Sequence, residues 1–555
     1  MSAPVSAPAA IEYPEKIDGA VLKVAGVVVL GAIMSILDIT VVNVALPTFQ
    51  KVFAPEGGDP LAYSTVAWTV TAYTLALATV IPLTGWAADR FGTKRLYMLA
   101  LVLFTLGSTL CAMATSIELL IAFRALQGLG GGMLMPLGMT IMTKAAGPKR
   151  MGRLMAILGI PMLLGPIGGP ILGGWLIEHH SWHWIFLINL PIGVIALAYA
   201  AWALPKDRPH PSETFDWVGM LLLSPGLAAF LYGVSSIPGE GTFFATKVAV
   251  PATIGLLMII AFVVYSFRPA HPLLDLRLFR HRNLTVAAIT MFLFALAFFG
   301  GLLIVPTYFQ EVRGESTTDA GLLMAAQGLG AMVTMPIAGA LADKFPVGRI
   351  VPFGLVLIIG GMFALTQIDA HTSYWGYILP VLFVMGLGMG GTMMPTMTSA
   401  LRALTGHEVA RGSTLLNITQ QIGSSIGVAI ISVVLTTGIK NQEIVTQARG
   451  FGEAAGKVTD PTQMPALLQK FPKVAEVLAP FAGDMASGQA ALLNAVREAM
   501  ATAFSATFWV AAFLLVLTLI PALFMPRTIE VSHLAEDNDD ADVTPQVRAM
   551  LERAN

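Results

Sequence analysis

Charged residues are scarce in this chain. Only 12% of its 555 residues are charged, against roughly 25% in an ordinary globular protein, and 55% are hydrophobic. So few charges could not cover the surface of a soluble fold of this length, so the composition favours a polytopic membrane protein. The 32 basic and 33 acidic residues nearly cancel, so no excess of positive charge indicates a nucleic-acid partner.

Cysteine is almost absent as well. Cys111 is the single one, which excludes an intramolecular disulfide and a metal site built from several cysteines. One short loop holds Glu178, His179, His180 and His183, but without a fixed ligand spacing, so we assign no metal site. The chain has no Walker A sequence, so we expect that ATP does not power it directly and that it needs no cofactor.

Apolar runs of membrane-spanning length are what the sequence has in plenty, and its mean hydropathy is +0.74. Stretches of about 20 apolar residues predict an all-α protein with fourteen transmembrane helices. The N-terminus lacks the basic start and the cleavage site of a signal peptide, so we expect the first run to stay as a span. The predicted spans are 24–46, 62–86, 96–115, 118–142, 152–177, 184–203, 216–236, 247–267, 284–309, 318–342, 350–367, 374–399, 412–436 and 507–525.

An even number of spans places both termini on one side of the membrane, and the loop charges indicate which side. The opposite short loops hold only Lys51, Lys247 and Arg313. Because basic residues concentrate on the cytoplasmic face, we expect both termini in the cytoplasm. The basic residues of the alternate loops are Arg90, Lys94, Arg95, Lys144, Lys149, Arg150, Arg153, Lys206, Arg208, Arg268, Arg277, Arg280, Arg282, Lys344, Arg349, Arg402 and Arg411.

The chain also repeats itself at long range. Gly85 and Asp89 of one short motif recur as Gly339 and Asp343, each 254 residues later. Two parallel halves of this kind form a transporter with a central site and alternating access, a duplication that a channel or a receptor does not need.

The repeat divides the chain into five parts. They are an N-terminal tail (1–23), a six-helix bundle (24–203), two linker helices (204–283), a second six-helix bundle (284–525) and an acidic tail (526–555). Residues 438–496 of the second bundle are charged and predicted to be a partly helical extracytoplasmic segment. This segment is either an interaction element or an ordered cap without a partner.

Several motifs in order resemble the major facilitator superfamily, specifically its fourteen-span drug:proton antiporters of the EmrB/QacA type. The resemblance covers residues 24–525. It implies the major facilitator fold, with two extra helices between the bundles, in a bacterial cytoplasmic membrane. The motifs are Leu37-Asp38-Ile-Thr40-Val-Val-Asn43, Gly85-Trp-Ala-Ala-Asp89-Arg90-Phe-Gly92-Thr-Lys94-Arg95, Arg124-Ala-Leu-Gln127-Gly128, Gly165-x-x-x-Gly169-Pro170-x-x-Gly173-Gly174, Trp184-Ile-Phe-Leu-Ile-Asn189 and Ala410-Arg411-Gly412-Ser413.

Two ionisable residues fall clearly inside predicted spans. Burying such a side chain costs roughly 2.5–3.5 kcal/mol, so each indicates a function. Asp38 lies ~12 Å and Arg124 ~9 Å from the outer ends of their helices, so the two could face each other across the central cavity. Apolar surroundings favour a protonated carboxyl and a nearby guanidinium favours the charged form. We therefore predict that Asp38 couples transport to protons or senses cations, and that Arg124 modulates it, with Asn43 and Gln127 of the same motifs in the site. The alternative is a static buried pair that orients helices.

Two further motifs have mechanical interpretations. Gly85 lets helices approach, and Asp89 at a helix end can hold basic side chains or a helix N-terminus, so residues 85–95 and Asp343 predict a latch that gates access. Orientation by positive charge alone would explain Arg90, Lys94 and Arg95 but not Gly85 and Asp89. The second motif spaces glycines four residues apart along one helix face, which predicts close packing. The resemblance implies a further role, since in antiporters of this family the helix also seals the cavity against leak. Its residues are Gly165, Gly169, Pro170, Gly173 and Gly174.

The favoured function is a multidrug efflux antiporter that uses the proton motive force to export amphipathic or cationic compounds. The 28 methionines and 29 phenylalanines suit adaptable apolar surfaces, although packing uses them too. An alternative keeps the fold but exports a lipid, a siderophore or another metabolite, with handover to an envelope adaptor protein. A membrane sensor or scaffold would leave the repeat and Asp38 unexplained, and substrate-dependent proton movement separates it from a transporter.

Overall fold

The computed structural model describes residues 17–55, 60–146, 150–206, 214–240, 242–269, 271–405, 408–455, 464–481 and 484–528. Every regular element in these ranges is helical, which confirms the predicted all-α membrane class. The predicted acidic tail from residue 529 onward and residues 1–16 of the N-terminal tail lie outside the described part.

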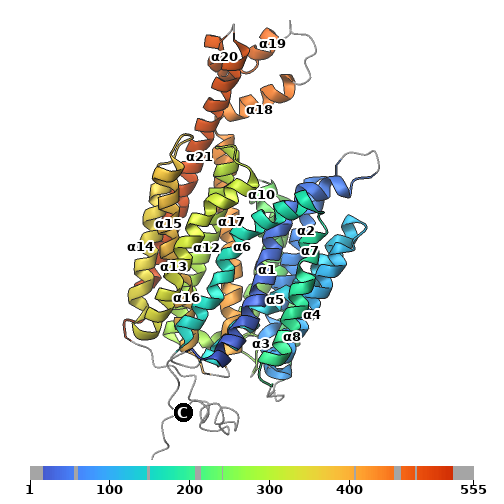
Figure 1. The fold of residues 1–555 in the computed structure, drawn as a ribbon, viewed down its shortest axis with the longest axis vertical. Coiled ribbons are helices and arrows are strands. Elements are labelled where there is room, and N and C mark those ends of the chain that lie inside the picture. The colour runs from blue at the N-terminus through green and yellow to red at the C-terminus, as the bar shows by residue number, and fades with distance from the viewer. Residues whose placement is uncertain are drawn as a thin grey trace, which may run out of the picture.

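The first half of the chain forms one bundle of helices (Figure 1). Asp18 begins it by capping α1, because its carboxylate accepts a hydrogen bond from the N–H of Val21 at 2.8 Å. The helices α2 and α3 are bent by 55° where Pro82 separates them, since proline lacks the N–H that would continue the helical ladder. The elements of this half are α1 (Gly19–Val52), α2 (Tyr63–Val80), α3 (Leu83–Phe91), α4 (Thr93–Ala112), α5 (Ile117–Ala146), α6 (Met151–His179), α7 (Trp184–Leu187) and α8 (Asn189–Ala203).

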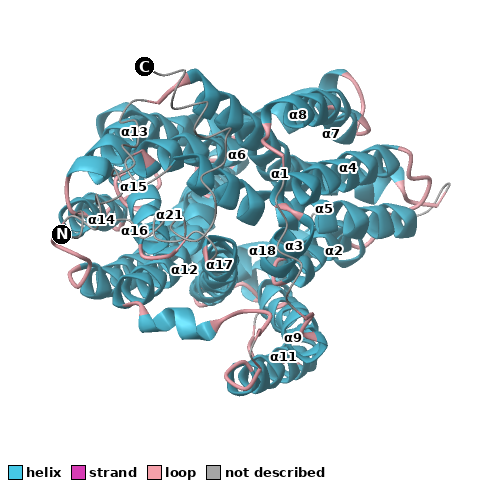
Figure 2. Ribbon diagram, turned by 90° about the horizontal axis from the view of Figure 1, so that it is seen from below, coloured by secondary structure: helices cyan, strands magenta, loops and turns pink. Residues whose placement is uncertain are grey.

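A pair of helices follows, α9 (Trp217–Ser235) and α11 (Thr246–Tyr265), joined through the short α10 (Ile237–Glu240). The two pack closely because Gly255 lies against the backbone of α9, where an added Cβ would come within 2.6 Å of the Gly226 carbonyl oxygen. Trp68 of α2 stacks on Tyr232 of α9 with ring centres 5.5 Å apart. Viewed along the bundle, the pair stands outside the two main groups of helices (Figure 2).

The second half of the chain forms a further group of helices, and part of it extends beyond the bundle. The chain enters this half through η1 (Leu276–Arg280), and a π-helical turn, η2 (Tyr374–Ile378), precedes α15. A small helical appendage stands clear of the bundle at one end (Figure 1), formed by α18 (Glu443–Ala455), α19 (Met464–Gln469), α20 (Pro472–Leu478) and the start of α21. The other helices are α12 (Arg282–Glu311), α13 (Thr317–Lys344), α14 (Val347–Leu365), α15 (Leu379–Gly390), α16 (Met393–Arg402), α17 (Val409–Lys440) and α21 (Met485–Ala522).

The number of helices that could cross a membrane is close to the fourteen predicted spans but is not identical to it. Twelve helices of the described residues are long and apolar enough to cross a membrane, and thirteen if the bent pair α2–α3 is one span. The remaining predicted span, 152–177, falls on α6, a helix of 29 residues. All fourteen predicted runs therefore coincide with helices.

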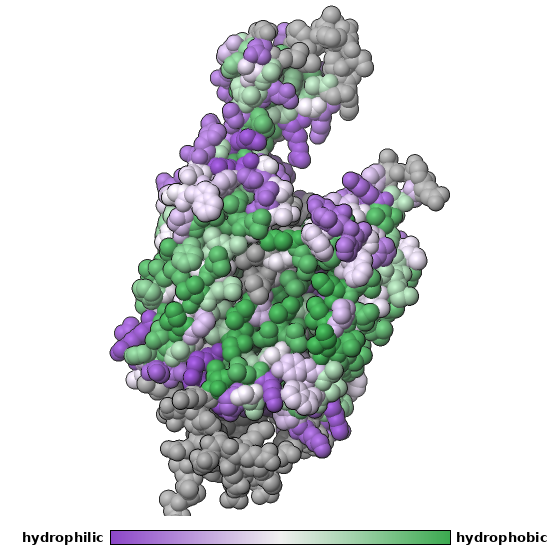
Figure 3. All heavy atoms as spheres, viewed as in Figure 1, coloured by the Kyte–Doolittle hydropathy of each residue, from purple (hydrophilic) through white to green (hydrophobic). Residues whose placement is uncertain are grey.

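The surface carries an apolar belt between two polar ends (Figure 3). Large apolar side chains lie exposed on helices of both halves and of the extra pair, for example Leu106, Val264 and Phe353. A soluble protein would bury such residues, whereas lipid accepts them. We call the end at which α1 begins and α21 ends the terminal end, and the opposite one the appendage end.

Candidate functional site: a buried ion pair beside a central cavity

Asp38 and Arg124 form a direct ion pair inside the first half. The Nη1 atom of Arg124 on α5 lies 2.5 Å from Oδ2 of Asp38 on α1, and both side chains are fully buried. Gln127, one turn further along α5, bridges the two, because its Nε2 donates to Asp38 Oδ1 at 2.7 Å and its Oε1 accepts from Arg124 at 2.7 Å. The i, i+3 spacing on α5 places both side chains on the face that meets α1.

Other helices complete this cluster. Arg124 Nε donates to the carbonyl of Thr69 on α2 at 3.0 Å. Asn189, at the start of α8, lies with its Nδ2 3.5 Å from Asp38 Oδ1 and 3.1 Å from the hydroxyl of Ser108. Sequence reasoning quoted Asn189 only as part of a motif and gave it no role. A buried charge needs such partners, because an unpaired one in an apolar interior is very costly.

Tyr73 of α2 connects the ion pair with the space between the two halves. The guanidinium of Arg124 lies over its ring, 4.2 Å from the ring centre. Its hydroxyl lies 3.4 Å from the hydroxyl of Ser35, a residue that lines the central cavity. Nothing in the sequence singled out Tyr73, because an aromatic residue in an apolar span has no distinguishing pattern.

Two details of the predicted site need correction. Asp38 and Arg124 do not face each other across the central cavity, since both belong to the first half and are packed against each other behind the cavity wall. Asn43 does not join them either. It lies five residues beyond Asp38 on α1 with an exposed side chain, so the helix turns it away from the buried cluster.

The central cavity, of about 340 Å³, lies between the two halves. Its lining from the first half is apolar apart from two hydroxyls, and its lining from the second half combines apolar side chains with a group of amides. The first-half lining is Ser35, Ile36, Ile39, Thr40, Leu77, Ile81, Gly131, Gly132, Met135 and Pro136; the second-half lining is Phe298, Phe299, Leu302, Met324, Gln327, Gly328, Met389, Met393, Asn417, Gln420, Gln421 and Ser424.

Asp343 joins the two halves at the terminal end. It lies in the last turn of α13, and its carboxylate accepts from the backbone N–H of Gly152, the first turn of α6, at 2.8 Å. It also accepts from Arg153 Nε at 2.9 Å and from Arg402 Nη2 at 2.6 Å. The positive end of α6 and two guanidinium groups thus hold one carboxylate that is only 4% exposed.

Asp89, its counterpart in the first half, makes the mirrored contact. It lies in α3 with Oδ2 3.7 Å from Arg411 Nε, in the first turn of α17. Gly85 packs on the same turn, where an added Cβ would lie 3.4 Å from the Arg411 Cα. Each half therefore meets the start of a helix of the other half through a motif carboxylate. A gating role for these contacts remains a prediction.

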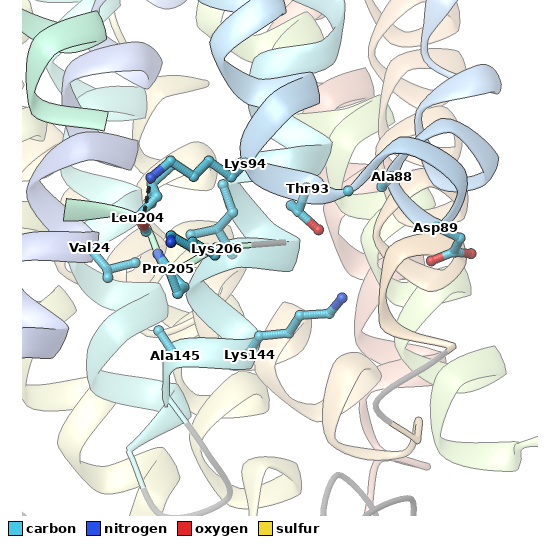
Figure 4. Close-up of a pocket in the computed structure, with 12 residues that line it drawn as sticks. Val24, Ala88, Asp89, Thr93, Lys94, Lys144, Ala145, Leu204, Pro205 and Lys206 are labelled. Atoms are coloured by element: carbon cyan, nitrogen blue, oxygen red, sulfur yellow. Dashed lines mark hydrogen bonds between the residues drawn. The ribbon is translucent and has the colours of Figure 1, made fainter. Parts of the chain in front are cut away.

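Gly92, Thr93 and Lys94 of the first motif line a pocket beside this latch (Figure 4). Gly92 joins α3 to α4 with a φ of 93°, a conformation that favours glycine. Lys94 donates to the carbonyl oxygens of Ala201 and Leu204 at 2.7 Å each, which ties α4 to the end of α8. Arg90 and Arg95 are exposed at the same end of the molecule.

The glycine stripe of α6 packs against α1 as the spacing predicts. Added Cβ atoms at Gly165 and Gly169 would collide with Ile36 and Thr40, and one at Gly173 would lie 3.1 Å from Val41. Gly174 faces Thr318 of α13 instead, at 3.3 Å. Pro170 lies within α6, but its side chain is outside the described part. The close packing is confirmed, whereas the sealing function remains a prediction.

The comparisons with known proteins agree with this geometry. Residues 28–428 match the model of the Major Facilitator Superfamily. The chain belongs to this superfamily. It is therefore a transporter and not an enzyme. Among solved structures of the superfamily it resembles the proton:xylose symporter XylE, with a TM-score of 0.54 at 13% identity over 94% of this chain and 99% of that one. The human organic anion transporter MFSD10 gives a TM-score of 0.56 at 16% identity over 90% and 100%.

Within the superfamily, its relatives include several named for drug resistance. The "Multidrug resistance protein B homolog" of Mycobacterium tuberculosis is 46% identical over 94% of this chain and 93% of that protein. The "Multidrug export protein EmrB" of Haemophilus influenzae is 30% identical over 76% and 81%. The "Putative multidrug resistance protein MdtD" of Escherichia coli O1:K1 / APEC is 33% identical over 74% and 85%.

Proposed function

We propose that this chain is a proton-coupled antiporter that exports amphipathic or cationic compounds by alternating access. The observation that carries the proposal is the fully buried pair of Asp38 and Arg124, one residue away from the cavity wall on α1. A static pair would stabilise the bundle no better than apolar packing, so its presence favours a role in the transport cycle. The relatives named for multidrug resistance support the cargo class.

The coupling step follows from the geometry of the pair. In the conformation described here Arg124 and Gln127 supply hydrogen bonds and a counter-charge to Asp38. When the helices α1 and α5 move apart, the carboxylate loses both. In apolar surroundings it then takes up a proton. Substrate entering the cavity would reverse this change and release the proton.

The latches set which side of the cavity is open. The contacts of Asp343 with α6 and of Asp89 with α17 join the halves at the terminal end, so this conformation is closed there. The alternation of basic loops supports a cytoplasmic location for that end, in the inner membrane of a bacterium. Release of both latches would open the cavity to the cytoplasm, while the glycine stripe of α6 limits leak. An adaptor protein that binds residues 438–496 stays a prediction.

The test is transport of ethidium driven by a pH gradient in proteoliposomes. We expect uptake by the wild type with counter-movement of protons, and loss of gradient-driven uptake in Asp38→Asn. A matched control is Glu476→Gln on α20, an exposed carboxylate of the appendage, which should transport like the wild type. Gradient-driven uptake by Asp38→Asn would contradict the coupling role. Wild-type protein that is well folded but moves neither dye nor protons would favour export of a lipid, siderophore or metabolite.

A further inference from the structure

Among the described residues, the lining of the central cavity holds no side chain that could balance the charge of a cation. None of its described lining residues is Asp, Glu, Lys, Arg or His. The carboxylate nearest along the chain, Asp38, is 1% exposed and already paired with Arg124 behind the wall. A charged ligand would therefore lose its water without gaining a counter-charge, which is unfavourable.

The second half instead presents a row of neutral polar side chains. Asn417, Gln420, Gln421 and Ser424 follow the i, i+3, i+4, i+7 pattern, which places them on one face of α17, and all four line the cavity. Gln327 of α13 joins them; it is only 7% exposed. Among the described residues the side-chain amides of Gln327, Gln420 and Gln421 have no hydrogen-bond partner in the protein. Gln420 and Gln421 are only half-buried and all three glutamines line the cavity, so their amides are accessible to a ligand there and can hydrogen-bond to it.

The hydrogen bonds within this row show which partner is missing. The Nδ2 of Asn417 already donates to the carbonyl of Ser413 at 2.8 Å, which leaves its Oδ1 as an acceptor. The hydroxyl of Ser424 donates to the carbonyl of Gln421 at 3.0 Å, so its oxygen can accept as well. The glutamine amides can adopt either role. The row thus favours a ligand that donates N–H or O–H groups.

The opposite wall offers nothing comparable. Its hydroxyls are used inside the first half, since Thr40 donates to the carbonyl of Leu37 at 2.9 Å and Ser35 contacts Tyr73. The rest of that wall is apolar, with Ile36, Ile39 and Leu77 among its residues. A ligand would therefore lie with its apolar body against the first half and its donors toward α17. A volume of about 340 Å³ is at the lower end of the range for drug-sized sites.

We propose that the cavity selects uncharged amphipathic molecules that carry N–H or O–H donors, and that Gln327 with the α17 row is its specificity determinant. This inference rests on the proposed export function and narrows its substrates, since it makes permanent cations the poorer ones. The two claims fail separately, because transport of cations alone would leave export standing and remove only the narrower claim.

The experiment compares two probes that differ in charge but share rings and donors. These are ethidium and the neutral diaminophenylphenanthridine that lacks the N-ethyl group of ethidium, at a pH where its ring nitrogen is unprotonated. We expect the purified wild type to bind the neutral probe about tenfold more tightly than ethidium, because the cavity offers no counter-charge that would offset the desolvation of the cation. Equal binding, or tighter binding of ethidium, would overturn the proposal.

Variants of the row sharpen this test. Gln327→Leu and Gln421→Leu should each weaken binding of the neutral probe about three- to tenfold, the effect of one lost hydrogen bond. Gln421→Glu supplies the missing counter-charge, so the preference should shift toward ethidium. Thr419→Val is the matched control on α17, since Thr419 is not among the cavity-lining residues; it should bind both probes like the wild type. An unchanged preference in folded Gln421→Glu would contradict the assignment of specificity to this row.

Discussion

The two halves of this transporter are related by the sequence repeat but differ in the polar side chains at their equivalent positions. The repeat that places Asp343 opposite Asp89 also places Gln327 at the position of Tyr73. In the first half that position contacts a charged cluster of Asp38, Arg124 and Gln127. In the second half it is an amide that lines the cavity. The difference suggests a division of work, with proton chemistry in the first half and substrate recognition in the second.

The largest expected effect comes from breaking the ion pair. Arg124→Leu leaves Asp38 buried without a counter-charge and should lower the free energy of unfolding by about 3–5 kcal/mol. The double variant Asp38→Asn with Arg124→Gln removes both charges and should recover most of that loss while remaining uncoupled. Thermal unfolding in detergent measures the stability, and proton movement in proteoliposomes measures the coupling.

The matched change in the second half should be much milder. Gln327→Leu removes no charge, so we expect its stability to stay within about 1 kcal/mol of the wild type. If Arg124→Leu proved as stable as Gln327→Leu, the loss of Arg124 would leave no uncompensated charge on Asp38. The proposed division between the halves would then be wrong.

The two latches should differ in a similar way, although by less. Asp343 is held at 2.6 Å by Arg402 and is 4% exposed, whereas Asp89 lies 3.7 Å from Arg411 and is 24% exposed. A more buried, shorter charge-assisted contact is worth more, so Asp343→Asn should open the terminal end more often than Asp89→Asn. The expected difference is on the order of 1–2 kcal/mol.

Position 206 follows the end of α8 and position 344 is the last residue of α13, both at the terminal end, so spin-label distances between them report this opening. A population of long distances should appear in Asp343→Asn first. Equal opening in the two variants would show that the latches are energetically equivalent despite their different burial.

The smallest effect is expected at the paired positions of the repeat. Tyr73→Phe removes only the hydroxyl that contacts Ser35 and keeps the ring under Arg124. We expect proton movement per substrate to fall about three- to tenfold, the worth of one hydrogen bond, with binding unchanged. Gln327→Leu should show the reverse pattern. Calorimetric measurement of substrate binding and measurement of proton flux on both variants distinguish these two patterns. A loss of substrate binding in Tyr73→Phe would contradict the separation of proton coupling from substrate recognition.

Much of the candidate site could be found from the sequence, but not its arrangement. Asp38 and Arg124 stood out because a charge inside an apolar span is rare and costly. Their direct contact could not be derived, since depth along two helices says nothing about which way each helix is turned. Asn43 illustrates this: it belongs to the same motif as Asp38, yet it is exposed. Tyr73 and the amides of α17 gave no signal, because polar and aromatic residues are common in spans.

The sequence by itself determined the all-α membrane class, the positions of fourteen apolar runs that all coincide with helices, the duplication and the motif carboxylates at the terminal end. These follow from composition, run length and local spacing, which act along the chain. Only the tertiary structure decided that Asp38 pairs with Arg124 within one half, that Asp343 meets α6 and Asp89 meets α17, and that the cavity is lined by uncharged amides. These depend on the rotation and packing of helices that are more than 80 residues apart in the chain, as the 86-residue separation of Asp38 and Arg124 shows. No local pattern specifies such contacts.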